Sequence, residues 1–79
     1  MPRVLVVDDE RCLRLTLSAF LSDAGYEVVT AEDAEEALDV VVTGNIDVVL
    51  TDIILPRRSG IQLLSAVRER GLRIPVVIM

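Results

Sequence analysis

Lysine, histidine and tryptophan are absent from this chain of 79 residues, and cysteine occurs once, at Cys12. A single cysteine excludes an internal disulfide and fits a reducing, cytoplasmic setting. The eight basic residues are all arginines, and 13 acidic residues bring the net charge to −5. This balance argues against binding nucleic acid or an anionic membrane surface through this segment.

Long hydrophobic runs are also absent. The apolar stretches are a few residues long, far below the roughly 20 needed to span a bilayer. The N-terminus lacks the charged region and long apolar stretch of a signal peptide. We therefore expect a single cytoplasmic domain that does not enter a membrane and has a modest core.

Short apolar runs alternate with segments of helical periodicity. The runs at residues 4–7, 27–30, 46–51 and 75–79 are rich in valine and isoleucine and predict strands. Between them, apolar residues recur at helical spacing over 13–24, 34–41 and 59–70, and Gly25, Gly44 and Gly71 are typical ends. Thr30 and Asp33 have the spacing of a capping box. The order βαβαβαβ predicts an α/β fold with a parallel sheet, right-handed crossovers and helices on both faces.

Three aspartates follow two of the predicted strands. Asp8 and Asp9 end the first apolar run, and Asp52 ends the third. The carboxyl ends of parallel strands form the binding crevice of such sheets, and neighbouring strands lie roughly 5 Å apart. Asp9 could instead be a helix N-cap, with Asp8 near the helix dipole and Asp52 at a turn. Capping explains one acid at a helix start, but it does not explain three acids that converge.

The three carboxylates suit phosphoryl capture. Clustered acids repel one another unless a cation neutralises them or their pKa values rise. An aspartate can act as a nucleophile and form an aspartyl phosphate, and Mg²⁺ neutralises the charge of the transferring group. Three acids without soft ligands favour Mg²⁺ or Mn²⁺ over zinc or copper.

Two segments give the chain a family resemblance. The run from Val4 to Val7 followed by Asp8-Asp9-Glu10, and the later segment Asp52-Ile53-Ile54-Leu55-Pro56-Arg57-Arg58-Ser59-Gly60, resemble the receiver domain of two-component response regulators. The resemblance implies a flavodoxin-like doubly wound sheet, here partial, with strand order 2-1-3-4. The loop after Asp52 can also be interpreted from its residues: Pro56 removes a backbone donor and forces Leu55 to extended geometry, and Gly60 permits a close backbone approach or an unusual dihedral near the helix start.

The resemblance also implies a function. Asp52 would be the phosphoacceptor, Asp9 a direct metal ligand, Asp8 a ligand through water, and the backbone carbonyl of Ile54 a further ligand. The phosphoryl donor would be a sensor histidine kinase that docks against the first helix and adjacent loops. We expect a signalling domain rather than an enzyme, acting as the input domain of a larger regulator, for example a transcriptional one.

The chain departs from the family pattern at its C-terminal side. Receiver domains have a serine or threonine after the fourth strand and a lysine after a fifth, and these 79 residues contain neither feature. Residues 1–79 would thus correspond to the N-terminal two-thirds of a receiver domain. One alternative is a truncated receiver that serves only as a folding or interaction module. Another is an aspartate-nucleophile phosphatase of the haloacid-dehalogenase kind, although that family needs Asp-x-Asp and Asp8 and Asp9 are adjacent.

The fourth predicted strand, residues 75–79, is apolar and uncharged. Strands at a stable sheet edge usually carry charges, prolines or bulges. We therefore expect self-association through this strand if it lies at the edge.

Overall fold

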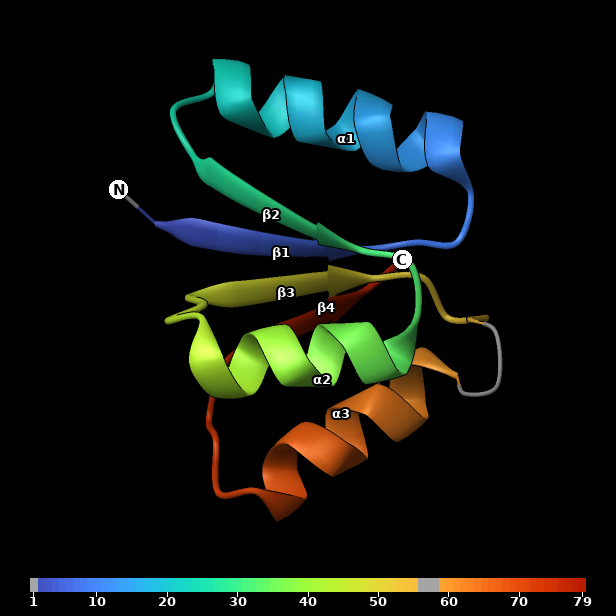
Figure 1. The fold of residues 1–79 in the computed structure, drawn as a ribbon, viewed down its shortest axis with the longest axis vertical. Coiled ribbons are helices and arrows are strands. Elements are labelled where there is room, and N and C mark those ends of the chain that lie inside the picture. The colour runs from blue at the N-terminus through green and yellow to red at the C-terminus, as the bar shows by residue number, and fades with distance from the viewer. Residues whose placement is uncertain (1, 56–58) are drawn as a thin grey trace.

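The computed structural model describes residues 2–55 and 59–79. It contains a parallel sheet with α1 on one face and α2 and α3 on the other (Figure 1). In chain order the elements are β1 (Arg3–Val7), α1 (Arg11–Asp23), β2 (Glu27–Ala31), α2 (Ala34–Thr43), β3 (Val48–Thr51), α3 (Gly60–Glu69) and β4 (Val76–Ile78). The strand order is β2-β1-β3-β4. The predicted α/β class, the parallel sheet and the order 2-1-3-4 are therefore confirmed.

The core lies between the sheet and the pair α2 and α3. The inner strand β1 is buried on both faces from Val4 to Val7, which explains its unbroken apolar run. Its neighbour β3 contributes Val49, which packs with Leu63 and Val67 of α3 in one hydrophobic cluster. Burial of this cluster fixes the sheet beneath the two helices and thereby the positions of the strand ends.

The element boundaries differ slightly from the predicted ones. The strand β3 begins at Val48 rather than residue 46, although Ile46 is still buried in the preceding loop. The helix α3 begins at Gly60, with Ser59 as its N-cap in a complete capping box. Gly25 and Gly71 follow α1 and α3 with φ angles of 97° and 76°, so the predicted glycine stops are correct at these two helices.

The capping box expected from Thr30 and Asp33 is not formed, and the alternative in which Asp9 is the N-cap of α1 is excluded. Asp33 is itself the N-cap of α2, and its carboxylate accepts the amide hydrogen of Glu36 at 2.8 Å, while Thr30 belongs to β2. Asp9 does not cap α1. Glu10 does, because its carboxylate accepts from the amides of Cys12 and Leu13 at 3.0 and 2.9 Å. Asp9 is thus not used by the helix end.

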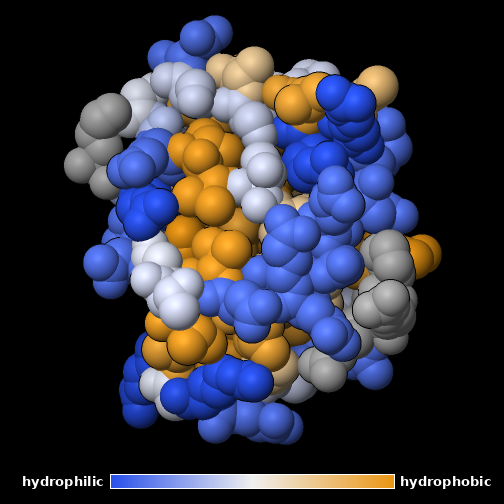
Figure 2. Space-filling view, viewed as in Figure 1, coloured by the Kyte–Doolittle hydropathy of each residue, from blue (hydrophilic) through white to orange (hydrophobic). Residues whose placement is uncertain are grey.

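The helix α1 is only partly covered by the described residues. Its apolar stripe contains Leu13, Leu17, Phe20 and Leu21, but the helix turns only part of this stripe toward the sheet. Leu17 and Leu21 are half-buried, whereas Leu13 and Phe20 remain 42% and 73% exposed. Figure 2 shows hydrophobic surface in a strip across the strands between α1 and α2. Among the described residues, no helix has the length and apolar character that crossing a bilayer requires.

Candidate functional site

The three predicted acids meet at one edge of the sheet. Asp8 and Asp9 follow β1, and Asp52 follows β3. The two strands pair with Val7 opposite Thr51, and the amide of Asp52 extends the ladder by donating to the carbonyl of Val7 at 3.1 Å. One carboxylate oxygen from each aspartate lies within 4.8 Å of the others. The expected convergence of these carboxylates is therefore present.

The three acids differ in their exposure to solvent. Asp8 is buried, with 1% of its surface exposed, whereas Asp52 is half-buried and Asp9 exposed. The Oδ1 atom of Asp8 accepts the amide hydrogen of Glu10 at 2.9 Å. Its Oδ2 atom is buried and has no hydrogen-bond partner within residues 2–55 and 59–79. An oxygen removed from water without a partner is costly, and a bound cation would relieve that cost.

The ligand atoms of the cluster fit a hard divalent cation. All three side chains offer carboxylate oxygen, which Mg²⁺ and Mn²⁺ prefer over softer donors. Two of the carboxylates keep contact with solvent, which leaves room for the water that Mg²⁺ retains. The unpartnered Oδ2 atom of Asp8 and the donor chemistry therefore agree with the predicted metal.

Asp52 is fixed by the start of α3. A β-carbon on Gly60 would lie 2.4 Å from the backbone oxygen of Asp52, so only glycine fits without movement. The amide of Gly60 donates to the carbonyl of Ile53 at 2.8 Å, and the Thr51 hydroxyl donates to the carbonyl of Asp52 at 3.0 Å. The predicted close approach at Gly60 is confirmed, and it positions the backbone on both sides of Asp52.

Ile54 lies two residues beyond Asp52. It forms an isolated antiparallel bridge with Ser59, and its side chain is 75% exposed. The bridge brings the segment after Asp52 back to Ser59, the N-cap of α3. The predicted effect of Pro56 on this loop, and the charges of Arg57 and Arg58, lie outside the described residues.

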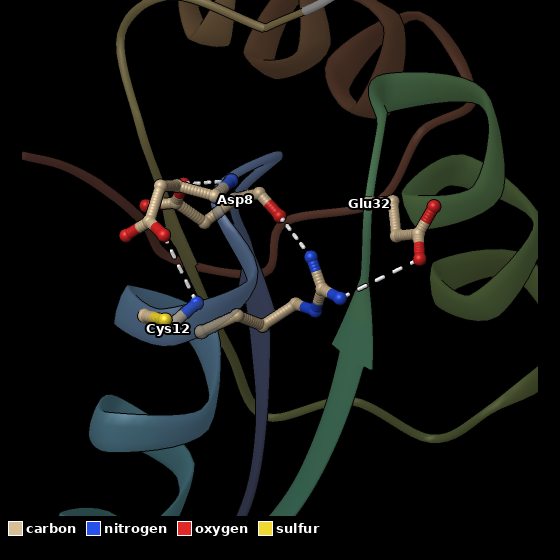
Figure 3. Close-up of polar contacts among 5 residues, drawn as sticks. Asp8, Cys12 and Glu32 are labelled. Carbon is tan, nitrogen blue, oxygen red and sulfur yellow. Dashed lines mark hydrogen bonds and ion pairs between the residues drawn. The ribbon is translucent and has the colours of Figure 1, made fainter.

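Arg14 of α1 was not identified from the sequence as part of the site. Its Nη1 atom donates to the backbone carbonyl of Asp8 at 2.8 Å, and its Nη2 atom lies 3.4 Å from a carboxylate oxygen of Glu32 (Figure 3). The Arg14 side chain is only 12% exposed. Its spacing with Leu17 and Leu21 places it on the side of the helix that faces the sheet. This spacing is the feature of the sequence from which its position near Asp8 could have been predicted.

A separate surface cavity lies at the opposite end of the sheet. It has a volume of about 460 Å³ and is lined by Arg68, Gly71, Leu72 and Arg73, between α3 and β4. The Arg68 guanidinium already donates to the carbonyls of Leu72 and Ile74 at 3.1 and 2.8 Å. These bonds close the α3–β4 loop, and the cavity contributes no group to the acidic cluster.

Known proteins are similar to this chain in sequence and in fold. The family model described as the response regulator receiver domain matches residues 4–79. The transcriptional regulatory protein DltR of Streptococcus agalactiae is 44% identical over 77 residues, which are 98% of this chain and 34% of that protein. The chain thus spans about a third of the length of this curated relative.

Solved structures agree with the sequence match. The chemotaxis response regulator CheY4 of Vibrio cholerae superposes with a TM-score of 0.94 at 38% identity, covering 99% of this chain and 67% of that one. The response regulator TrrA of Thermotoga maritima, solved in complex with Mg²⁺-BeF, gives a TM-score of 0.87 at 40% identity, covering 99% and 70%. The parallel sheet, the paired acids at its carboxyl edge and these matches establish that the chain belongs to the response regulator receiver domain family.

Proposed function

We propose that this chain is a phosphoacceptor segment of a two-component response regulator, in which Asp52 receives a phosphoryl group from a histidine kinase. Asp8, Asp9, Asp52 and the backbone carbonyl of Ile54 would hold Mg²⁺, or Mn²⁺ in its place. The observation that carries the proposal is the convergence of three carboxylates, one of which, that of Asp8, has a buried oxygen with no partner among the described residues.

The proposed reaction needs few groups from the protein. A carboxylate oxygen of Asp52 attacks the phosphorus atom, the bond from phosphorus to the donor imidazole nitrogen breaks, and the imidazole leaves. Mg²⁺ when bound supplies positive charge to the phosphoryl oxygens. Asp52 is half-buried at a strand end, where a donor can approach it, and the Thr51 and Gly60 contacts hold its backbone in place. The carboxylate ends as a mixed anhydride, so the chain acts as a receiver of phosphate rather than as an enzyme.

The similar structure of TrrA supports the choice of metal. That protein was solved with Mg²⁺-BeF, and 99% of this chain superposes on it. We extend the metal preference to this chain because its own cluster consists of oxygen donors only.

The exposed side of α1 is the proposed docking surface for the kinase. Leu13 and Phe20 lie on the same side of the helix and are 42% and 73% exposed, and Leu13 is close in sequence to Asp8 and Asp9. An exposed apolar surface of this kind is typical of protein–protein contacts. The domain would act in the cytoplasm, where a kinase has ATP, and it would control a transcriptional output as the similarity to DltR suggests.

We further propose that the 79-residue polypeptide associates with itself through β4. The amide of Val49 donates to the carbonyl of Pro75, and the amide of Met79 donates to the carbonyl of Thr51. Backbone groups alternate in direction along a strand, so those of Val76 and Ile78 point away from β3. They have no strand partner among the described residues.

Phosphorylation can be tested with acetyl phosphate as donor. After incubation with Mg²⁺, peptide mass spectrometry should find a phosphoryl group on Asp52 only, with none in Asp52→Asn. Because these 79 residues contain no lysine to stabilise the transferring charge, we expect labelling to be substoichiometric. Asp39→Asn is the matched control, since Asp39 is exposed on α2 and should not affect labelling.

Two results would contradict this proposal, and one would contradict only the expectation that labelling is partial. Label on Asp52→Asn would show that another group is the acceptor. Stoichiometric and stable label would show that a lysine is dispensable. A folded protein that neither binds Mg²⁺ nor takes any label would favour the alternative of an interaction module.

A further inference from the structure

The partly buried guanidinium of Arg14 is the strongest unassigned polar group near the acids. Arginine side chains are seldom buried unless their charge and hydrogen bonds are satisfied. Arg14 is 12% exposed, and its closest bond goes to a backbone oxygen, the carbonyl of Asp8 at 2.8 Å. Its other contact, to Glu32, is long at 3.4 Å and involves a carboxylate that is 69% exposed. Such an exposed ion pair contributes little by itself, so the bond to Asp8 is the stronger constraint.

The backbone of Asp8 is held from both sides. Its amide donates to the carbonyl of Ala31 on β2 at 3.1 Å, and its carbonyl accepts from Arg14 on α1. The carbonyl of Asp8 belongs to the peptide unit that leads into Asp9. A peptide unit is planar, so the direction of this carbonyl also sets the direction in which the Asp9 backbone leaves β1.

We propose that Arg14 is a positioning residue of the acidic cluster: by holding the Asp8 carbonyl, it orients the Asp8–Asp9 peptide so that both carboxylates face Asp52. This inference rests on the proposed metal site, because its main consequence is tighter binding of Mg²⁺. The polar contacts of Arg14 are to the Asp8 carbonyl and to Glu32, not to a carboxylate of the cluster. Arg14 therefore acts through the backbone of Asp8.

Charge and geometry predict opposite effects at this position. A fixed positive charge near the cluster repels Mg²⁺, so removing the charge alone would tighten metal binding. Losing the orientation of the ligands would weaken binding instead, by about 10- to 100-fold when indirect partners of a metal are removed. The sign of the change therefore separates the two roles.

Two substitutions exploit this difference. Arg14→Lys keeps the charge but loses the planar fork that reaches the Asp8 carbonyl, and Arg14→Met keeps only the apolar stem. We expect both variants to bind Mg²⁺ more weakly in an NMR titration, Arg14→Lys by about 10-fold. Arg70→Lys is the matched control, because Arg70 also donates to a backbone carbonyl, that of Ala66, but is the C-cap of α3. It should leave the affinity unchanged.

A second measurement needs no metal. The amide of Glu10 donates to Oδ1 of Asp8 and reports on the orientation of that residue. In Mg²⁺-free buffer, Arg14→Lys and Arg14→Met should shift the amide proton of Glu10 and speed its exchange, whereas Arg70→Lys should not. Thermal unfolding of each variant shows that the protein measured is folded.

The outcomes are distinct. If Arg14→Lys matches the wild type in both measurements and Arg14→Met binds Mg²⁺ more tightly, Arg14 acts only as a charge and the proposal is overturned. If the wild type binds no Mg²⁺, the proposed function fails, and the Glu10 amide alone decides the role of Arg14. An unchanged Glu10 amide in both variants would refute it.

Discussion

Asp8 and Asp9 are neighbours in the sequence but have different surroundings. Asp8 is buried and bonded to the amide of Glu10, whereas Asp9 is exposed and is not used as a helix cap. Glu10, which caps α1 with both carboxylate oxygens, is therefore occupied by the helix end. Three consecutive acids thus have three different surroundings, and substitution can distinguish them.

The first prediction compares two of these acids. Asp9→Ala should weaken Mg²⁺ binding by about 10-fold because a carboxylate of the cluster is lost, with little effect on stability. Glu10→Ala should have little effect on Mg²⁺ binding. It should lower the free energy of unfolding by about 1 kcal/mol, because it removes the cap of α1. NMR titration with Mg²⁺ and urea unfolding measure the two effects.

Two results would contradict the expected role of Asp9 in Mg²⁺ binding. If Glu10→Ala lowers the Mg²⁺ affinity more than Asp9→Ala does, the metal contact has been assigned to the wrong acid. If the titration moves no amides near Asp9 and Asp52 in the wild type, the cluster does not bind Mg²⁺.

At the scale of elements, the start of α3 determines where Asp52 lies. Gly60 is the first residue of the helix and packs its α-carbon against the backbone oxygen of Asp52. The Ser59 hydroxyl and the Gln62 side chain complete a capping box, so this helix end is well defined. The helix and Asp52 are therefore coupled through backbone contact rather than through a side chain.

The second prediction tests this coupling. In Gly60→Ala the added methyl group would lie 2.4 Å from the Asp52 oxygen and must displace the backbone. We expect a loss of about 1–3 kcal/mol in stability, as for other overpacked sites, together with weaker Mg²⁺ binding. The measurements are urea unfolding and NMR titration.

Gly25→Ala is the control for Gly60→Ala. Gly25 has a φ of 97° and nothing within 4 Å of an added β-carbon, so alanine there adds backbone strain alone. Its cost should be about 1–2 kcal/mol, and its Mg²⁺ affinity should equal that of the wild type. Equal metal binding by Gly60→Ala and Gly25→Ala would show that the contact of Gly60 with Asp52 does not position the site.

At the scale of the whole molecule, the described residues leave two apolar surfaces uncovered. One is the exposed side of α1, where Phe20 is 73% exposed, and the other is the edge strand β4. On β4, Val77 is 48% exposed and no residue of the strand is charged. Apolar edges of this kind pair readily with other strands.

The third prediction is that the 79-residue polypeptide is not a stable monomer at tens of micromolar. Val77→Lys should shift it toward the monomer, because a lysine on an edge strand disfavours pairing with a second copy. Val42→Lys adds the same charge at another exposed valine, on α2, and should leave the association unchanged. Sedimentation equilibrium measures the mass.

Two results would contradict the predicted self-association or its location on β4. A monodisperse monomer of 8.7 kDa that unfolds cooperatively would refute it. Association that persists unchanged in Val77→Lys would place the contact elsewhere, with the uncovered side of α1 as the next surface to substitute.

The sequence by itself determined the order of elements, the class of fold and the edge of the sheet at which the acids lie. These follow from local signals: the β-branched runs of β1 and β3 are continuous because both strands are inside a parallel sheet, and Gly25 and Gly71 end helices through their own backbone freedom. The family resemblance rested on the same local segments, and the family match confirmed it.

Only the tertiary structure decided how the acids are used. The sequence pattern does not distinguish Asp8 from Asp9. Asp8 is buried because α1 and β2, which follow it in the chain, pack against it in the folded structure. Arg14 of α1 bonds to the Asp8 carbonyl, and Gly60 of α3 contacts Asp52. Both contacts depend on how each helix packs against the sheet. Local patterns place residues on a strand end or a helix face, but contacts between elements depend on how these elements pack, and packing is a property of the whole fold.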